Sequence, residues 1–378
     1  MARRRHLSSS ATTGPAAGGR RARGFTLIEL LIGALIGLLS TLVIAKVFAF
    51  SEAQRRATST GSDAQVNGAL ALYTIQRDAQ MAGYGMTASL DALGCPIKGR
   101  FNGGDFAWTL APAQITAGAS GAPDSINFMS SASTRYSMPT LVIANHSRTA
   151  TTFFASSTIG IAPGDFMIVV PEAIDENNWC SVFSVTGVAA GNRVMHESGV
   201  AWNPPAGQEI FPGSPPGNDG YLASSYLLSL GSFINRTYSV GAGNALQLTS
   251  FDATSATSST VELYPGIVQL QAFYGKDTDG DGAIDGYDKV APTTNAGWRQ
   301  VIAVRIALVA RSAQYEKESV TAASPLWDVG TTVPVAGSAT CGSSKCVTLQ
   351  VNQLSDWQRY RYKVYDVIIP LRNLLWHA

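Results

Sequence analysis

Five aspartates within one twelve-residue stretch form the densest group of potential metal ligands in the sequence. The stretch, DTDGDGAIDGYD, occupies residues 277–288. Hard cations such as calcium take oxygen ligands at this kind of spacing, and Gly282 stands where such a loop needs its tight turn. Without a cation the carboxylates would repel one another. The sequence therefore predicts a structural calcium site with these ligands: Asp277, Asp279, Asp281, the Ala283 carbonyl, Asp285 and Asp288.

Two features of this stretch leave a second interpretation open. The last ligand position holds Asp288 in place of the glutamate that binds calcium through both oxygens, which predicts a weaker site. The flanking residues have the pattern of strands, so the stretch would form an isolated loop. The alternative is the solvated turn of a β-hairpin, which binds no metal.

Four cysteines could form disulfides or bind a metal. Cys95, Cys180, Cys341 and Cys346 all follow a long apolar segment, on the side of a membrane where disulfides form. Four cysteines allow three pairings. The short spacing favours a Cys341–Cys346 bridge, which leaves Cys95 to pair with Cys180. Zinc is the alternative, although neither a C-x-x-C spacing nor a histidine cluster supports it.

The sequence contains none of the common catalytic motifs. We find no G-x-S-x-G nucleophile elbow, no H-E-x-x-H helix, no phosphate-binding Walker loop and no dinucleotide fingerprint. His146 and His196 are isolated in β-rich segments, where a histidine is more often a packing or surface residue than a catalytic one. The chain is therefore predicted not to be an enzyme, and a membrane-anchored periplasmic hydrolase is the alternative.

The charge balance divides the chain into two parts. Its 378 residues include 27 Lys+Arg and 26 Asp+Glu, with 46% hydrophobic and 14% charged residues. This composition excludes a mostly disordered chain and offers no basic surface for nucleic acid. Residues 1–24 hold six arginines and no acid, and without these arginines 21 bases face 26 acids, a net charge of −5. We interpret residues 1–24 as a targeting leader.

An apolar segment follows the leader. Residues 25–50 read FTLIELLIGALIGLLSTLVIAKVFAF, and 16 uncharged residues separate Glu29 from Lys46. As a helix, Phe25 to Ala45 would span about 31 Å, which is enough to cross the hydrocarbon core of a membrane. The positive-inside rule keeps the arginine-rich leader in the cytoplasm, so the residues after the segment are expected to be exported.

Glu29 is unexpected inside this segment, because an unpaired acid costs on the order of 2.5–3.5 kcal/mol at the centre of a bilayer. The run RGFTLIE at residues 23–29 resembles the class III signal of type IV pilins and pseudopilins. The resemblance implies that a prepilin peptidase cuts between Gly24 and Phe25 and methylates Phe25. The leader of 24 residues is longer than the shortest leaders of that family.

The same resemblance gives Glu29 a role in assembly. After cleavage Glu29 is the fifth residue, about 6 Å along the helix from the new ammonium group. A neighbouring subunit shifted by this distance could pair its ammonium with Glu29, which would offset the desolvation and fix the register between subunits. The alternatives are a single-span anchor with one tolerated acid and a secretory or twin-arginine signal peptide.

Helical spacing resumes after the apolar segment and predicts a helix over residues 51–85, ending at the glycines Gly83 and Gly85. Two apolar stripes follow this spacing, and both are expected to pack in the core. One stripe consists of Val66, Leu70 and Tyr73, and the other of Leu72, Ile75, Ala79 and Ala82.

From about residue 100 the pattern changes to short strands between turns rich in Gly, Pro, Ser and Thr. We therefore expect an α+β fold: a pilin-like, long N-terminal hydrophobic helix packed on a mostly antiparallel β-sheet head over residues 86–378. Residues 100–220 are expected to form an inserted β-rich subdomain, and residues 221–378 a C-terminal sheet that carries the aspartate loop. The clearest strand patterns are at 125–129, 140–144, 165–170, 181–186, 232–240, 268–274, 301–309 and 359–369.

Phrases spread along the chain resemble the PilW type of minor pilin, and their order carries the resemblance. They are LYTIQRDAQMAGYG (72–85), GDFMIVV (164–170), CSVFSVTGV (180–188), IVQLQAFYGKDTDGDGAIDGYD (267–288), WRQVIAVRIALVARS (298–312) and YRYKVYDVIIPLRN (360–373). The alternative is the J-type minor pseudopilin of type II secretion, which shares the N-terminus and a long β-rich head.

The resemblance implies a role in type IV pilus assembly, in a priming or tip complex. The expected partners are prepilin peptidase, other major and minor pilins, the inner-membrane assembly platform and membrane lipid, with no nucleic acid. The chain would cross the inner membrane once, with its N-terminus cytoplasmic and its head periplasmic, and then enter the pilus at the cell surface.

Overall fold

The structure is a computed structural model that describes residues 24–133, 138–175, 177–205, 207–214 and 218–375. The predicted leader, apart from Gly24, lies outside the described residues. The chain divides into two compact units, residues 1–57 and 58–378. The N-terminal helix begins in the first unit, and every strand belongs to the second.

Helix α1 (Leu27–Met81) is 55 residues long and contains no proline. It ends four residues before the predicted limit of Gly85, and both Gly83 and Gly85 adopt positive φ angles, +82° and +76°. The Gly83 N–H donates to the Met129 carbonyl at 2.8 Å, so the chain leaves the helix by bonding to a strand. Glycine is required at these positions because other residues adopt such angles at a cost.

Only one of the two predicted stripes of α1 packs in the core. Val66, Leu70 and Tyr73 are 53%, 45% and 64% exposed, so the prediction for this stripe is wrong. Its residues lie on the side of the helix opposite the buried face, because sheets cover one side only. The buried face follows the spacing of a helix and consists of small residues and one isoleucine: Ala64, Gly68, Ala71, Ile75, Ala79 and Ala82.

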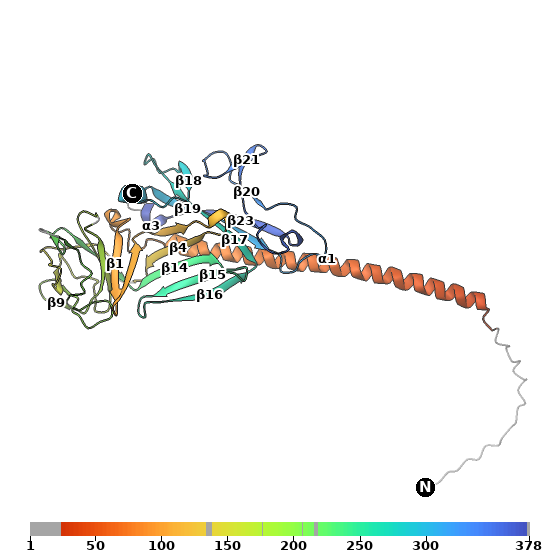
Figure 1. Cartoon of the computed structure of the whole chain (residues 1–378), viewed down its shortest axis with the longest axis horizontal. Coiled ribbons are helices and arrows are strands. Elements are labelled where there is room, and N and C mark those ends of the chain that lie inside the picture. Colours follow the sequence, from red (N-terminus) through yellow and green to blue (C-terminus); the bar gives the residue numbers. More distant parts are fainter. Residues whose placement is uncertain (1–23, 134–137, 176, 206, 215–217, 376–378) are drawn as a thin grey trace, which may run out of the picture. The chain divides into compact units, whose positions relative to one another are not determined.

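Two antiparallel sheets share one hydrophobic core with this buried face of α1 (Figure 1). The first sheet has the strand order β16-β15-β14-β4-β3, and the second has the order β18-β17-β19-β23. In chain order the strands are β3 (Ala113–Thr116), β4 (Ser125–Ser131), β14 (Phe233–Val240), β15 (Ala245–Asp252), β16 (Thr257–Pro265), β17 (Ile267–Lys276), β18 (Gly286–Asp288), β19 (Val301–Arg311) and β23 (Tyr362–Pro370).

A close approach at Gly68 fixes the helix against β23. A Cβ atom at this position would lie 2.3 Å from the Tyr365 ring, so only glycine fits there. The Tyr365 hydroxyl donates to the Gln65 carbonyl at 3.2 Å, one turn away on the helix. Small residues on the buried face thus let the sheet pack directly against the helix backbone.

A buried ion pair joins the two sheets. Asp124 directly precedes β4 and is 1% exposed. Its Oδ2 accepts hydrogen bonds from Lys289 Nζ at 2.6 Å and from the Ala272 N–H of β17 at 2.8 Å. Lys289 also donates to Gln271 Oε1 on β17. Because every polar atom of the pair that faces the core has a partner, we interpret the cluster as structural.

The rest of the head contains a third, larger sheet with strand order β2-β1-β8-β7-β13-β5 and three small ribbons. Within the described residues, all strand pairs are antiparallel except β1 with β8. These strands are β1 (Pro96–Phe101), β2 (Gly104–Thr109), β5 (Thr140–Leu141), β6 (Thr152–Phe154), β7 (Phe166–Val170), β8 (Cys180–Ser184), β9 (Gly187–Ala189), β10 (Arg193–Met195), β11 (Gly213–Ser214), β12 (Asn218–Asp219), β13 (Tyr226–Gly231), β20 (Leu326–Asp328), β21 (Ala339–Cys341) and β22 (Ser344–Thr348).

The expected inserted subdomain is interleaved with the helix-bound sheet. Strands β3 and β4 lie inside the predicted range of 100–220, yet β4 pairs with β14 along six residue positions. Conversely, β13 lies after residue 220 and pairs with β7 inside that range. Sequence order therefore does not separate the two layers. The short helices are α2 (Asn295–Arg299), α3 (Arg372–Leu375), η1 (Leu90–Ala92), η2 (Ala119–Gly121) and η3 (Trp357–Arg359).

Candidate functional site: the N-terminal segment and the aspartate loop

The predicted cleavage position lies just before α1. Gly24 and Phe25 are exposed and non-helical, and no heavy atom would lie within 4 Å of a Cβ added at Gly24. Phe25 is 87% exposed. Among the described residues, nothing therefore covers the bond between Gly24 and Phe25.

Glu29 and Thr26 form a reciprocal cap on the first turn of α1. The Thr26 N–H and hydroxyl donate to Glu29 Oε2 at 3.0 and 2.9 Å. The Glu29 N–H donates in return to Thr26 Oγ1 at 3.3 Å. This is the capping box, and the spacing T-x-x-E before an apolar run was its signal in the sequence. Sequence reasoning treated Glu29 as a register residue and missed this second role.

The cap leaves half of the Glu29 carboxylate available. Both side-chain hydrogen bonds use Oε2, and Oε1 has no partner among the described residues. Thr26 lies after the predicted cleavage position, so the capping box is kept in a chain that begins at Phe25. Glu29 can therefore hold its own helix and present one oxygen to another group.

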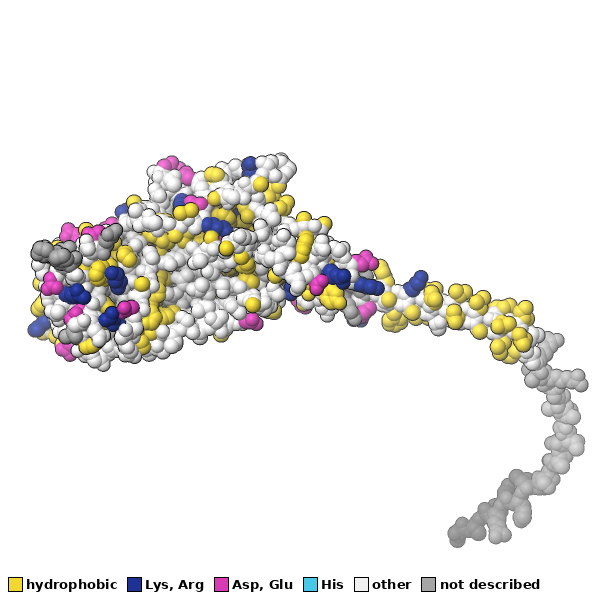
Figure 2. Space-filling model, viewed as in Figure 1, with side chains coloured by type: hydrophobic (Ala, Val, Ile, Leu, Met, Phe, Trp, Pro, Cys, Tyr) yellow, Lys and Arg dark blue, Asp and Glu magenta, His cyan; other side chains and the backbone are white. Residues whose placement is uncertain are grey.

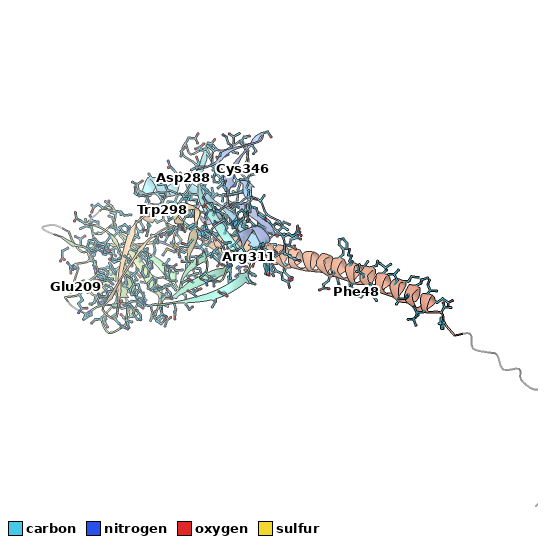
Figure 3. All side chains as sticks on the ribbon, turned by 45° about the vertical axis from the view of Figure 1, so that its right-hand side comes forward. Phe48, Glu209, Asp288, Trp298, Arg311 and Cys346 are labelled. Carbon is cyan, nitrogen blue, oxygen red and sulfur yellow. A yellow bond between two sulfur atoms is a disulfide. The ribbon has the colours of Figure 1, made fainter. Side chains whose placement is uncertain are left out.

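The segment that follows is apolar and uncovered. Residues 27–52 have a mean hydropathy of 2.5, none of the most apolar window is buried, and the helix is long and apolar enough to cross a membrane. Figure 2 shows hydrophobic side chains along this part of the helix, and Figure 3 shows Phe48 projecting outward from it. A surface of this kind requires lipid or other apolar helices around it.

The aspartate loop connects β17 to β18 and brings three of its five aspartates together. Ligand oxygens of Asp277, Asp279 and Asp285 all lie within 4.8 Å of one another. Asp277 accepts from the Gly280 and Gly282 N–H groups at 2.7 and 2.9 Å. Both glycines have positive φ angles, +81° and +84°, so the turn predicted at Gly282 is present.

Hydrogen bonds also orient Asp285. Its Oδ2 accepts from the Thr278 hydroxyl and from the Thr278 N–H, both at 2.6 Å. The hydroxyl and then the backbone N–H lower the pKa of the Asp285 carboxyl below its usual value. The carboxylate is therefore ionised at neutral pH, as a cation ligand must be.

Asp281 and Asp288 do not belong to this convergent group. Asp281 accepts from the Ala283 N–H at 2.7 Å. Asp288, labelled in Figure 3, forms an ion pair with Lys276 at 2.8 Å and accepts from the Val290 N–H. Three of the five predicted carboxylates thus converge, and the ion pair with Lys276 accounts for the separate position of Asp288.

The four cysteines form two disulfides, Cys95–Cys180 and Cys341–Cys346. The first joins the residue before β1 to the first residue of β8, and the second closes the β21–β22 hairpin. No cysteine is free, so none is available as a thiolate ligand for zinc.

His146 and His196, isolated in the sequence, meet in the head. Their Nε2 atoms lie 2.9 Å apart, and both rings are buried. The two residues are 50 positions apart, and no local pattern links them. Sequence reasoning had no signal for this pair.

Two family models match the chain. Residues 234–373, from β14 to α3, match the family described as type IV pilus-assembly protein W, and residues 19–45 match the prokaryotic N-terminal methylation motif. No curated protein and no solved structure matches the chain. The second match covers Gly24, Phe25 and Glu29, and implies processing by prepilin peptidase and interaction with other pilins.

The first match covers the helix-bound sheet from β14 onward together with the aspartate loop. It favours the pilus assembly family over the type II secretion alternative, and the family is one of structural pilin-type proteins. The α+β fold, with its long apolar helix and antiparallel sheets, agrees with both matches. The two matches support a PilW-type minor pilin that takes part in type IV pilus assembly.

Proposed function

We propose that this minor pilin is a subunit of the priming or tip complex of the pilus. It is inserted in the inner membrane with a cytoplasmic N-terminus and a periplasmic head, cut between Gly24 and Phe25, and methylated at Phe25. It is then drawn from the membrane at the assembly platform and joins other minor pilins before the major pilin follows.

The uncovered apolar half of α1 is the observation that supports membrane insertion and assembly with other pilins in this proposal. Burying one large apolar side chain contributes about 1.5–3 kcal/mol. The exposed set in residues 27–50 includes eleven leucines and isoleucines that are each about half exposed or more, among them Leu30, Ile36 and Leu39. Such a surface is stable in lipid or among the apolar helices of other subunits. A chain that moves from one to the other keeps it covered throughout assembly.

We further infer that Glu29 sets the register between subunits. The capping box occupies Oε2, and Oε1 has no partner among the described residues. The ammonium group of a neighbouring mature chain, shifted by about 6 Å along the helix, would reach this oxygen. A charged group away from water is stable only when an opposite charge lies beside it. Any other register between subunits would leave the ammonium and the carboxylate unpaired and would therefore be less stable.

Substitutions at Glu29 and Thr26 test the register and separate it from the cap. Glu29→Ala and Glu29→Gln should insert and be cleaved normally but reach surface pili at a tenth of the wild-type level or less. Thr26→Ala removes the cap, worth about 0.5–2 kcal/mol, and keeps the carboxylate, so incorporation should remain near the wild-type level. If Thr26→Ala and Glu29→Ala reduced incorporation into pili equally, Glu29 would act through the helix cap alone. Normal incorporation of Glu29→Ala would refute its role in setting the register between subunits.

We also propose that the aspartate loop binds calcium and that the ion stabilises the head. The convergence of Asp277, Asp279 and Asp285 supports this proposal, as does the orientation of Asp277 and Asp285 by backbone N–H groups. Carboxylate oxygens are the ligands calcium prefers. In a periplasmic or extracellular head the ion would lock the loop between β17 and β18.

Thermal unfolding of the full chain in detergent, with calcium or with a chelator, tests this site. At calcium about 100-fold above its Kd, the free energy of unfolding should rise by about 2.7 kcal/mol. Asp279→Asn should abolish the rise. Asp288→Asn should lower stability in both conditions but keep the rise, because Asp288 pairs with Lys276. Unchanged unfolding of the wild type in calcium would eliminate the proposal.

A further inference from the structure

His146 and His196 come from two segments that are joined to different sheets. His146 exchanges backbone hydrogen bonds with Tyr221, at 2.7 and 2.8 Å, close to β13. His196 follows β10 in the small sheet β6-β10-β9, and its N–H donates to the Thr151 carbonyl at 2.8 Å. The 2.9 Å contact between their Nε2 atoms therefore adds a side-chain link between the small sheet and the third sheet. It lies beside the backbone bonds from the Ile143 N–H to the Phe154 carbonyl and from the Ser156 N–H to the Leu141 carbonyl.

Aromatic rings enclose the pair. Phe153 stacks on His146 with a centroid separation of 3.7 Å, and Phe211 meets both rings edge-on. Phe183 lies 5.0 Å from His196. His146 is 2% and His196 5% exposed. Any positive charge on either imidazole would thus be largely withdrawn from water and surrounded mainly by aromatic rings.

The charged and titratable groups around the pair do not compensate such a charge. Arg148 and Glu209 lie with His196 on a cavity of about 100 Å³ and face each other at 4.0 Å. Asp219 accepts from the Arg148 N–H, and Glu197, next to His196, is exposed. Burial raises the pKa of the Tyr221 phenol, whose hydroxyl donates to Trp179 and Ser181. Among the described residues no carboxylate is hydrogen-bonded to either imidazole.

The contact defines which nitrogen carries each proton. Two facing Nε2 atoms form a hydrogen bond only if one ring donates and the other accepts. Nδ1 of His146 is buried without a partner, and a buried N–H without an acceptor is rarer than an unsatisfied acceptor. His146 therefore donates from Nε2, and His196 accepts. A metal bound by both Nε2 atoms would force a proton onto the unpartnered Nδ1, which argues against a metal here.

We propose that the His146–His196 pair is an acid-sensitive latch, which holds the small sheet β6-β10-β9 against the head at neutral pH and releases it on acidification. Protonation of His196 replaces its acceptor by a second donor, so the hydrogen bond is lost. Protonation of either ring also places a charge among the phenylalanines. The latch thus converts a fall in pH into exposure of Phe153, Phe183 and Phe211.

The direction of the pH dependence follows from the depressed basicity of both rings. Burial lowers the pKa of His146 to about 4; burial, and then the charge of His146, lowers the pKa of His196 to about 3. In the open state both rings return toward the usual pKa of about 6.5. The closed state is therefore fully favoured above pH 6.5, and it loses stability as pH falls from 6.5 toward 4, because the open state binds protons that the closed state excludes.

Hydrogen exchange measured by mass spectrometry on the full chain in detergent tests the latch. Between pH 7.5 and 5.5 each histidine should raise the opening constant about tenfold, so two histidines give about 100-fold. After correction for intrinsic exchange, this acceleration is expected in peptides covering residues 140–156 and 187–197. Strand β19 is the internal reference and should change little. The same change in β19 and in these peptides would overturn the proposal.

A double variant provides the control for this experiment, and a spectroscopic measurement on the wild type replaces it if the variant does not fold. His146→Phe together with His196→Leu should exchange at the same corrected rate at both pH values. If that variant does not fold, nitrogen-15 NMR of the histidine rings in the wild type decides. The expected result is two neutral rings at pH 5.5, with the proton of His146 on Nε2. Protonated rings at pH 5.5, or a shift of both Nε2 signals on adding one equivalent of zinc, would overturn the latch.

Discussion

The two halves of α1 are both rich in apolar residues but have opposite surroundings. Between Leu27 and Glu52 the apolar side chains are large, and none of the most apolar window is buried. Between Ala64 and Ala82 the inward positions are alanine, glycine and one isoleucine, and these positions contact two sheets. The two halves of α1 therefore differ mainly in the size of their apolar side chains.

This difference separates the surfaces that are packed within one chain from those that are free to contact lipid or other subunits. Small residues bring α1 close to the sheet, as at Gly68, and that packing is completed within the head. Large exposed residues have no such counterpart and are available to lipid or to other pilins. We therefore expect substitutions in the second half to change stability, and substitutions in the first half to change assembly.

The largest effect on stability is expected from Ile75→Ala. Ile75 is fully buried on the inward face of α1, and truncating such a side chain leaves a cavity that costs about 2–5 kcal/mol. Denaturant unfolding of the full chain in detergent, followed by tryptophan fluorescence of the head, measures the loss. Ile36→Ala, in the exposed half, is the matched control and should change the free energy of unfolding by less than about 0.5 kcal/mol. Similar losses in the two variants would erase the distinction between the halves.

A smaller effect is expected from Asp78→Asn, which tests the polar anchor of the same half. Asp78 accepts two hydrogen bonds from Arg236 at 3.1 Å and one from the Tyr238 hydroxyl at 2.6 Å. Because Arg236 is about a third exposed, solvent screens part of the loss, and we expect about 1–3 kcal/mol. Asp63→Asn, exposed on the same helix, should be neutral in the same unfolding measurement. A neutral Asp78→Asn would mean that α1 is held by apolar packing alone.

The smallest effect is expected from Tyr73→Ser, on the exposed stripe opposite the buried face. Tyr73 is 64% exposed, so its removal should alter the free energy of unfolding by less than about 0.5 kcal/mol. Calorimetry of the full chain would measure this change beside that of Ile75→Ala. A loss above about 1 kcal/mol would show that the stripe is covered within a single chain.

The sequence predicted the class of the fold and most of the strands that have an apolar pattern. Each expected segment overlaps a strand: β4, β5, β7, β8, β14, β17, β19 and β23. Strands β13, β15 and β16 are among those that were missed. Strand β16 is a Ser/Thr-rich edge strand with mostly exposed side chains and no alternation. The two stripes on α1 could not be ranked, since periodicity shows that a face is apolar and does not show which face meets a sheet.

The N-terminal site could be predicted because its residues are neighbours in the sequence. Gly24, Phe25 and Glu29 form one run, and even the missed capping box had a local signal at Thr26. The aspartate loop was predicted as a unit, but the competing ion pair between Asp288 and Lys276 depends on the pairing of β17 with β18. The histidine pair depends on tertiary structure alone, so no sequence pattern could have located it.

Mass spectrometry of pili sheared from the cell surface tests most directly the claim that this chain is assembled through its N-terminal helix. We expect the chain in that fraction in amounts far below the major pilin, beginning at an N-methylated Phe25 and carrying both disulfides. A chain that still carries residues 1–24, or one found in the membrane fraction and absent from the pili, would contradict the account.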